Sequence, residues 1–228
     1  MLVHITGVFT PEQATACRAA LGRARWIDGK TTAGPAAARV KQNAEADLTD
    51  PEVRKWSDAV RHALAASKAF MATALPARIC PPSFNRYGGG QTYGVHNDAA
   101  LFEFAQAGGS AWVRSDLAAT LFLNAPEAYD GGELVIEDTF GPRRIKLAAG
   151  DMVLYPASSQ HGVAPVTRGE RLASFFWIQS MVRDDARREL LYRLDGAIRR
   201  LHQTAAGNPA APDLLGIYHN LLRMWSET

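Results

Sequence analysis

The sequence predicts an α+β protein whose core is mainly β, a sandwich or jelly roll, with helices before and after it. Three observations support this. Between residues 80 and 180, short runs rich in β-branched and aromatic residues alternate with turn signals. Residues 1–79 contain two helix-start signals, and residues 181–228 contain two amphipathic stripes with helical spacing. We expect the N-terminal strand and helices to pack on the core and the C-terminal part to form a helical extension.

The N-terminal part begins with a short strand predicted in residues 1–8. Thr10, Pro11 and Gln13 follow with the pattern of an N-cap, a first-turn proline and a capping-box glutamine. This pattern predicts a helix through about residue 22. A second start signal, T-D-P-E at residues 49–52, predicts a longer helix with one buried face. The stripe on this face consists of Val53, Trp56, Val60, Leu64 and Met71, with Ser67 in its one gap.

The central part contains five clear β-rich runs: L-A-A-T-L-F-L-N, G-G-E-L-V-I-E-D, R-R-I-K-L, D-M-V-L-Y-P and A-S-F-F-W-I-Q-S. Glycine-containing turn signals such as Asp130-Gly131-Gly132 separate them. After Ser180 the apolar spacing becomes helical, on two stripes that A-A-G-N-P-A-A-P divides. The stripes are Leu190, Leu194, Ile198 and Leu201, then Leu214, Tyr218, Leu221 and Trp225.

Composition limits the classes of function. The chain has 228 residues and is 47% hydrophobic, which is enough for one well-buried core. A net charge of +2 favours neither nucleic acid nor a membrane surface as a partner. Cys17 and Cys80 are too few for a disulfide framework and are expected to be small buried residues. The N-terminus has no basic segment followed by a long apolar run, so we expect a cytoplasmic protein.

The segment Y-G-G-G-Q-T-Y-G-V-H-N-D places His96 and Asp98 two residues apart, so that both point the same way if the backbone is a strand. That pair alone is a weak signal. His161 lies between two predicted strands, and a jelly roll can bring it beside the pair. Two imidazoles and one carboxylate form the facial triad of non-haem Fe(II) oxygenases. Zinc, with water as a fourth ligand, is the alternative metal.

Arg171 opens the last apolar strand run, and its guanidinium is expected to point into the interior of the barrel. A buried guanidinium needs an anionic partner, for which a carboxylate has the best geometry. The carboxylate of a co-substrate fits this role. An internal ion pair with Glu133 or Glu137 is the alternative.

These motifs, with Y-D-G-G-E-L, G-D-M-V-L-Y-P-A-S-S-Q-H and the tail Y-H-N-L-L-R-M-W-S-E, closely resemble the PKHD-type hydroxylases. This is a bacterial branch of the prolyl 4-hydroxylase-like Fe(II)/2-oxoglutarate dioxygenases, and the resemblance covers essentially the whole chain. It implies a double-stranded β-helix core, iron on His96, Asp98 and His161, 2-oxoglutarate held by Arg171, and L-ascorbate as a supporting reductant.

The resemblance also limits what can be expected of the substrate. Phe122 stands where some protein prolyl hydroxylases have a tyrosine, which makes Tyr87 and Tyr93 the expected phenolic donors and leaves prolyl specificity open. The expected substrate is a peptide or protein side chain, or a small molecule connected with iron handling. Two other functions remain open: a non-catalytic sensor of metal and 2-oxoglutarate, and a Zn hydrolase. Arg171 argues against the hydrolase.

Three segments have further expected roles. Gly88-Gly89-Gly90 is expected to bend the backbone at the mouth of the barrel, or else to be an ordinary loop. Residues 99–113 are expected to form a substrate lid with a Gly-Gly hinge, or a covering flap whose core holds Phe102, Phe104 and Trp112. The helices after residue 183 are expected to pack within the chain or, alternatively, to join subunits into a homo-oligomer.

Overall fold

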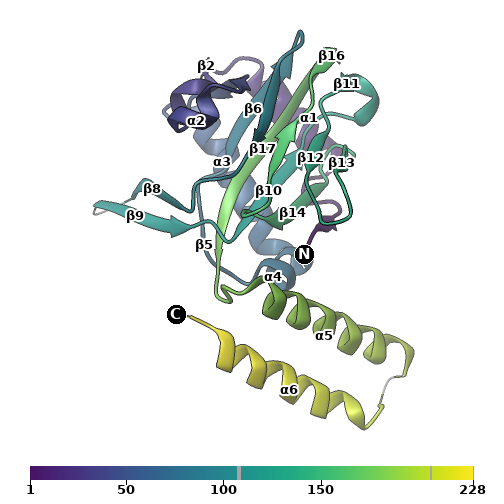
Figure 1. Ribbon diagram of the computed structural model, residues 1–228. Helices are drawn as coiled ribbons and strands as arrows, with labels where there is room; N and C mark the ends of the chain where they lie inside the picture. The colour runs from purple at the N-terminus through teal and green to yellow at the C-terminus, as the bar shows by residue number, and fades with distance from the viewer. Residues whose placement is uncertain (107–108, 206, 228) are drawn as a thin grey trace.

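Two antiparallel sheets face each other and form the core of the structure, a computed structural model that describes residues 1–106, 109–205 and 207–227 (Figure 1). The large sheet has the order β1-β14-β10-β17-β6-β4-β2, and β5 pairs with the far end of β17. Its strands are β1 (Val3–Ile5), β14 (Met152–Pro156), β10 (Leu117–Phe122), β17 (Glu170–Ser180), β6 (Ser83–Gly88), β4 (Ala44–Ala46), β2 (Trp26–Asp28) and β5 (Pro76–Ile79).

The small sheet covers the inner face of the large one. Its order is β13-β12-β15-β7-β3. The strands are β13 (Arg143–Ile145), β12 (Leu134–Ile136), β15 (His161–Val163), β7 (Thr92–His96) and β3 (Lys41–Gln42). Two separate pairs complete the β structure, β11 (Asp130–Gly131) with β16 (Val166–Arg168), and the hairpin of β8 (Leu101–Gln106) and β9 (Gly109–Arg114).

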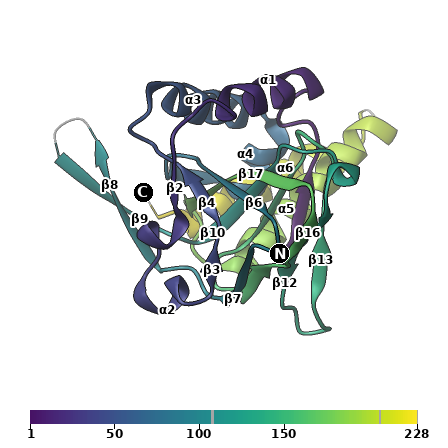
Figure 2. The same cartoon turned by 90° about the horizontal axis from the view of Figure 1, so that it is seen from above.

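Side chains of the large sheet alternate between two hydrophobic layers, as strand geometry requires. In β10, Leu117, Ala119 and Leu121 face a layer shared with the N-terminal helices. Ala118 and Phe122 instead face the small sheet, where they pack with Leu134 and Ile136 of β12 and with Val153 and Tyr155 of β14. Figure 2 shows α1 and α3 on one side of the large sheet and β7 and β12 on the other. The predicted mainly β core with flanking helices is confirmed.

The N-terminal helices α1 (Pro11–Leu21) and α3 (Pro51–Ala66) begin where the sequence predicts. Thr10 and Gln13 form the expected capping box, and the side chain of Asp50 caps α3 by accepting from Glu52 N. The prediction of one continuous helix through Met71 is wrong. Ser67 is extended and caps a new helix, α4 (Lys68–Ala74), accepting from Phe70 N at 3.2 Å.

This second cap changes which side chains are buried. Because the backbone turns at Ser67, Phe70 enters the core and Met71 becomes exposed. The predicted first strand is also shorter than residues 1–8, since only Val3–Ile5 pair with β14. Two short 3-10 helices, η1 (Gly29–Thr32) and η2 (Pro126–Ala128), and the helix α2 (Pro35–Ala38) complete the elements.

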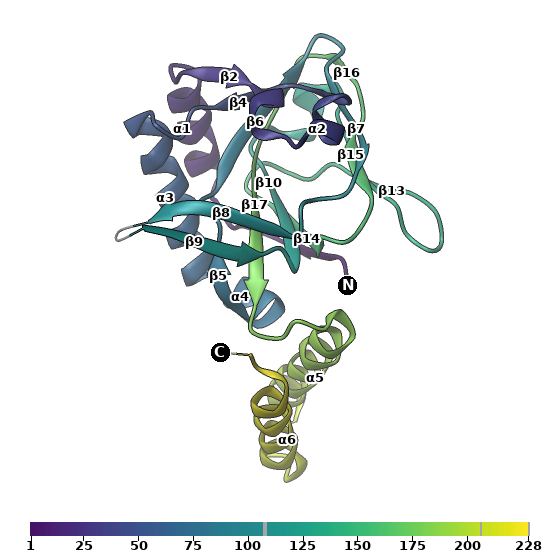
Figure 3. The same cartoon turned by 60° about the vertical axis from the view of Figure 1, so that its left-hand side comes forward.

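The C-terminal extension consists of α5 (Asp185–Thr204) and α6 (Ala210–Trp225). Figures 1 and 3 show the two helices side by side, outside the two sheets. Asp184 caps α5 by accepting from Arg187 N at 2.8 Å. The expected stripe is shifted by one residue at its start, because Leu190 is 55% exposed whereas Leu191 is fully buried against Leu75 and Val182.

Both cysteines are buried, as predicted. Burial raises the pKa of the Cys17 thiol to about 12 and that of Cys80 to about 11, so neither is a reactive thiolate at neutral pH. Within the described ranges, no helix has the length and apolar character needed to cross a membrane.

Candidate functional site

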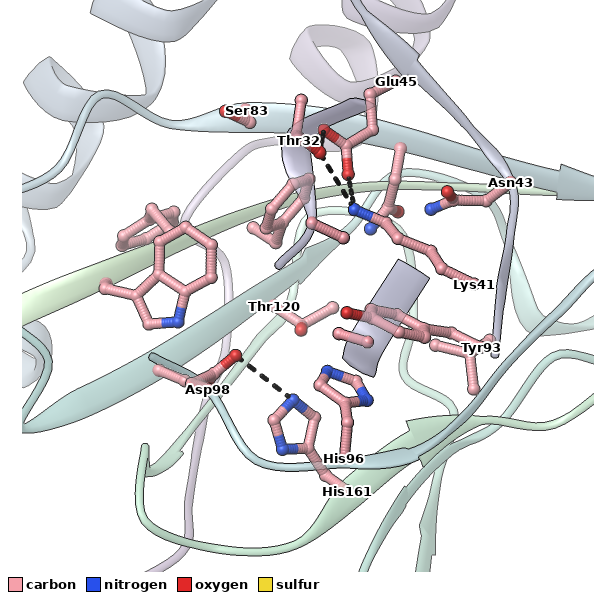
Figure 4. Close-up of a pocket in the computed structure, with 18 of the residues that line it drawn as sticks. Thr32, Lys41, Asn43, Glu45, Ser83, Tyr93, His96, Asp98, Thr120 and His161 are labelled. Carbon is pink, nitrogen blue, oxygen red and sulfur yellow. Dashed lines mark hydrogen bonds and ion pairs between the residues drawn. The ribbon is translucent and has the colours of Figure 1, made fainter. Parts of the chain in front are cut away.

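His96, Asp98 and His161 meet at one end of the inner strands β7 and β15 of the small sheet, although the two histidines are 65 positions apart in the sequence. His96 ends β7 and His161 begins β15, and these two residues are paired in the register of the neighbouring strands. The prediction that Asp98 lies on the strand is wrong, because it follows the end of β7. Its side chain nevertheless faces the same cavity as the two histidines (Figure 4). One ligand atom from each residue lies within 4.8 Å of the others.

The two imidazoles are oriented by backbone carbonyls. Nδ1 of His96 lies 2.9 Å from the carbonyl oxygen of Gly94, and Nδ1 of His161 lies 3.0 Å from that of Ser159. A carbonyl oxygen only accepts, so each Nδ1 must donate its proton. Each Nε2 is therefore left with a free lone pair, which is the tautomer that a metal requires.

Burial controls the charges in this cluster. It lowers the pKa of His96 to about 4, with the neighbouring His161 acting in the same direction. Burial also raises the pKa of the Asp98 carboxyl, against the opposing influence of His161, 3.8 Å away. In the described part of the chain, Oδ2 of Asp98 is buried without a hydrogen-bond partner. A divalent cation would offset the cost of this buried carboxylate, so the donor set fits a metal.

Arg171 lies on β17 in the wall of the same cavity and is 1% exposed. It extends between the rings of Tyr87 and Phe122, whose centroids lie 5.4 and 5.3 Å from its guanidinium carbon. Within the described residues, its one hydrogen bond goes to Oδ1 of Asn85 at 3.2 Å, and its Nε has no partner.

The alternative of an internal ion pair is not observed. Among residues 1–106, 109–205 and 207–227, neither Glu133 nor Glu137 pairs with Arg171, and Glu133 instead lies 4.0 Å from Arg144. A fully buried guanidinium with one neutral partner is costly unless a ligand supplies the missing anion. Arg171 therefore fits a site for a carboxylate.

Both predicted tyrosines line the cavity. Tyr87 is buried beside Arg171, and Tyr93 stacks on the ring of His96 with centroids 3.7 Å apart. Burial raises the pKa of both phenols, so each hydroxyl keeps its proton at neutral pH and can donate it.

The glycine run lies outside the cavity lining, whereas the proposed lid segment contributes to one cavity wall. Gly89 and Gly90 have positive φ, form the tight turn between β6 and β7, and do not line the cavity. The run therefore bends the backbone as expected, but in a turn outside the cavity lining, which agrees with the alternative of an ordinary loop. Leu101–Gln106 and Gly109–Arg114 of this segment pair as the antiparallel strands β8 and β9. Residue 108 of the predicted hinge lies outside the described residues.

The three aromatic residues of this segment do not form a core. Phe102 lines the cavity and stacks on Trp177, with centroids 3.8 Å apart. Phe104 is partly buried and Trp112 is 54% exposed. The hairpin thus contributes one aromatic side chain to the cavity wall.

The cavity wall also contains a group of polar residues that was not predicted from the sequence. Lys41, Asn43 and Glu45 are all buried and line the cavity together with Thr32 (Figure 4). The signal that identifies them is their alternation, because residues i, i+2 and i+4 of an extended segment share one face.

Family models match most of the chain. The model of the 2OG-Fe(II) oxygenase superfamily matches residues 82–179, which contain the triad and Arg171. The PKHD-type hydroxylase C-terminal domain matches residues 185–227, which form α5 and α6.

Solved structures and curated relatives agree with these matches. The fold is similar to that of a prolyl hydroxylase from Trichoplax adhaerens in complex with a hypoxia inducible factor peptide, with a TM-score of 0.56, 12% identity and coverage of 83% of this chain and 86% of that one. HygX from Streptomyces hygroscopicus, with nickel, 2-oxoglutarate and hygromycin B bound, has a TM-score of 0.53, 16% identity and coverage of 78% and 82%. The present chain is 52% identical to a PKHD-type hydroxylase from Xanthomonas campestris and 54% identical to one from Burkholderia thailandensis, in each case over the full length of both chains. The chain belongs to the PKHD-type hydroxylase family and is a 2-oxoglutarate-dependent dioxygenase.

Proposed function

We propose that the chain hydroxylates a C–H bond of its prime substrate, with Fe(II) on His96, Asp98 and His161 and 2-oxoglutarate on Arg171. One observation carries this proposal: a set of two imidazoles and one carboxylate shares a cavity with a buried arginine that, among the residues the structure describes, has no carboxylate partner. When bound, iron and 2-oxoglutarate supply the oxidation by O₂, in which 2-oxoglutarate is converted to succinate and CO₂.

The protein residues position and shield the reactants. Arg171 presents a planar fork to the distal carboxylate, while Asn85 holds that fork in one orientation. Tyr87 and Tyr93 provide neutral phenolic donors along the same wall. Phe102 and Trp177 shield one side of the cavity from water. The chain needs no general acid or base of its own, because iron and 2-oxoglutarate would supply the oxidation.

The substrate, reductant and compartment are also part of the proposal. L-ascorbate is proposed as the supporting reductant because the family resemblance implies it. The buried, unpaired thiols support a reducing compartment, for which the cytoplasm is the proposed location. The acceptor is a peptide or protein side chain or a small molecule, with a link to iron handling as a hypothesis. Phe122 stands where some protein prolyl hydroxylases have a tyrosine and has no hydroxyl, so we do not propose that the acceptor is a prolyl residue.

Succinate formation tests the catalytic proposal. The Fe(II)-loaded protein is expected to convert 2-oxoglutarate to succinate slowly without a prime substrate, and to require O₂. Substitution of His96, Asp98 or His161 by Ala should abolish both the bound iron and this turnover. Full turnover in His161→Ala would remove that residue from the site. Binding of iron and 2-oxoglutarate without any succinate would favour the non-catalytic sensor.

A homo-oligomer through the C-terminal helices remains a hypothesis. It is motivated by Ile217 and Met224 on α6, which are 51% and 73% exposed. Light scattering tests it: replacement of both residues by Ser should convert an oligomer into monomers, whereas a wild-type monomer at all concentrations would contradict it.

A further inference from the structure

The chain crosses from one sheet to the other directly beside the catalytic cavity. Lys41 in β3 pairs with Tyr93 in the small sheet, whereas Glu45 in β4 pairs with Asn85 in the large sheet. Asn43 lies at the crossing. Because the segment is extended, Lys41, Asn43 and Glu45 present alternate side chains to one face, and all three line the cavity that contains the triad (Figure 4). We call these three residues the polar strip.

Two members of the strip form a buried ion pair. The ammonium of Lys41 donates to Glu45 and, at 3.0 Å, to the hydroxyl of Thr32, which in turn donates to Oε2 of Glu45 at 2.7 Å. An ammonium has three protons, so Lys41 keeps one donor for another partner. Each carboxylate oxygen of Glu45 likewise has a further lone pair.

Asn43 is the third member and is only 5% exposed. Burial raises the pKa of the neighbouring Tyr87 phenol, and the Asn43 amide acts in the opposite direction. Neither amide atom, however, has a hydrogen-bond partner within the described residues. The side chain packs over Gly29, where an added Cβ would lie 1.8 Å from Oδ1, so a larger residue at position 29 would displace this amide. Burying an amide without partners is unfavourable, and a ligand in the cavity that hydrogen-bonds to it would offset that cost.

The charges around the cavity cancel once the cofactors are bound. Arg171 balances the distal carboxylate of 2-oxoglutarate. Asp98 and the other carboxylate of 2-oxoglutarate together balance the two positive charges of Fe(II). Lys41 and Glu45 balance each other. No net charge is left to pair with a charged substrate, and burying an unpaired charge there would be costly.

The wall beside the strip leaves room for a ligand. Ala33, Gly34 and Ala37, from the turn before α2 and from α2 itself, line the cavity with small side chains. A polar face beside a wall of small residues suits a flat group that donates and accepts hydrogen bonds without a charge.

We propose that the polar strip binds an uncharged amide group of the prime substrate, which makes the substrate a peptide or another amide-bearing molecule. Lys41 and Asn43 donate to the carbonyl oxygen of that amide, and Glu45 accepts from the N–H of a neighbouring amide that points the same way. This inference rests on the proposed function, since it presumes that a prime substrate enters the iron cavity.

Three probes with one skeleton and different charges test the inference on the full-length, anaerobic Fe(II) and 2-oxoglutarate holoenzyme. They are N-acetylalanine N-methylamide, which is uncharged, N-acetylalanine, an anion, and alanine N-methylamide, a cation. Paramagnetic iron relaxes the protons of a probe that binds near it, so NMR relaxation gives both affinity and proximity. The uncharged diamide should bind about tenfold more tightly than either charged probe, because only it avoids a buried unpaired charge.

Two variants link this preference to Asn43. Asn43→Leu should weaken the uncharged probe by about 5- to 150-fold, the range expected for a lost buried hydrogen bond. Asn43→Asp, which keeps the size of the side chain, should shift the preference toward the cationic probe and remains informative if the Leu variant does not fold. Asn220→Leu, on an exposed position of α6, is the matched control and should change nothing.

Several outcomes would overturn the inference. Equal or tighter binding of a charged probe to the wild type is one, and failure of all three probes to bind is another. Unaltered preference in both Asn43 variants would remove Asn43 from the substrate site. Weaker 2-oxoglutarate with intact probe binding would instead place Asn43 on the co-substrate. Succinate formation without any probe, measured on the same preparation, reports separately whether the proposed oxygenase function itself holds.

Discussion

Arg171→Met separates the co-substrate site from the metal site. The substitution removes the guanidinium and leaves His96, Asp98 and His161 in place. Since Arg171 is 1% exposed, water has little access to replace the lost contact. The distal carboxylate of 2-oxoglutarate would then face two aromatic rings and the single amide of Asn85.

The expected loss follows from this environment. Removing a charge-assisted, bidentate contact from a buried carboxylate costs about 2–4 kcal/mol, or about 30- to 1000-fold in 2-oxoglutarate affinity. Arg171→Lys should recover only part of the loss, because an ammonium lacks the planar fork. Iron affinity should change little. Calorimetric titration of 2-oxoglutarate and of the metal on the same variant measures both quantities.

Stability without ligands provides a second, independent measurement. Because Arg171 has no anionic partner within the described residues, Arg171→Met should leave the free energy of unfolding unchanged or increase it. Arg188 is the matched control, since it is equally buried but donates to the carbonyls of Val182 and Arg183 and to Asp185. Arg188→Met should destabilise the protein by about 1–3 kcal/mol and leave 2-oxoglutarate affinity intact. Unchanged 2-oxoglutarate affinity in Arg171→Met, or a loss of about 3–5 kcal/mol in its stability, would refute the reasoning.

Three further predictions concern the fold and the metal site. Ser67→Ala should cost about 1 kcal/mol in urea unfolding by removing the cap of α4, and no loss would show that this cap is dispensable. Leu191→Ala should cost about 2–5 kcal/mol, whereas the exposed Leu190→Ala should stay within about 0.5 kcal/mol, and equal effects would contradict the packing of α5. Metal affinity should decrease as the pH falls through the raised pKa of Asp98, because the proton and the metal compete for this carboxylate. His96, with a pKa of about 4, should not bind a competing proton until the pH approaches that value. Calorimetry in buffers of different ionisation enthalpy should therefore detect protons that leave Asp98 when the metal binds. A metal affinity that does not depend on pH would contradict this.

The sequence predicts the site well where chemistry and periodicity agree. His96 and Asp98 could be paired because they are two residues apart, and Arg171 could be assigned to the interior because it opens a long apolar strand. His161 required more, since its place beside His96 depends on the register between β15 and β7. Sequence spacing does not contain that register, so a jelly roll had to be assumed.

The errors have local physical causes. Ser67 has a helical spacing from Leu64 and Met71, but its hydroxyl offers the backbone a cap in place of a helix turn. Leu190 and Leu191 are adjacent and equally apolar, so periodicity could not decide which of them faces Leu75. Lys41 and Glu45 were missed because a charged pair usually indicates a solvated surface, and only the crossing between the sheets buries them.

A crystal structure of the anaerobic protein with Mn(II) and 2-oxoglutarate tests the central claim most directly. We expect anomalous scattering from one ion bound by Nε2 of His96, Nε2 of His161 and a carboxylate oxygen of Asp98. The keto acid end of 2-oxoglutarate should lie on that ion, and its distal carboxylate should accept two hydrogen bonds from Arg171. An ion at other residues, or a 2-oxoglutarate whose distal carboxylate avoids Arg171, would contradict the account.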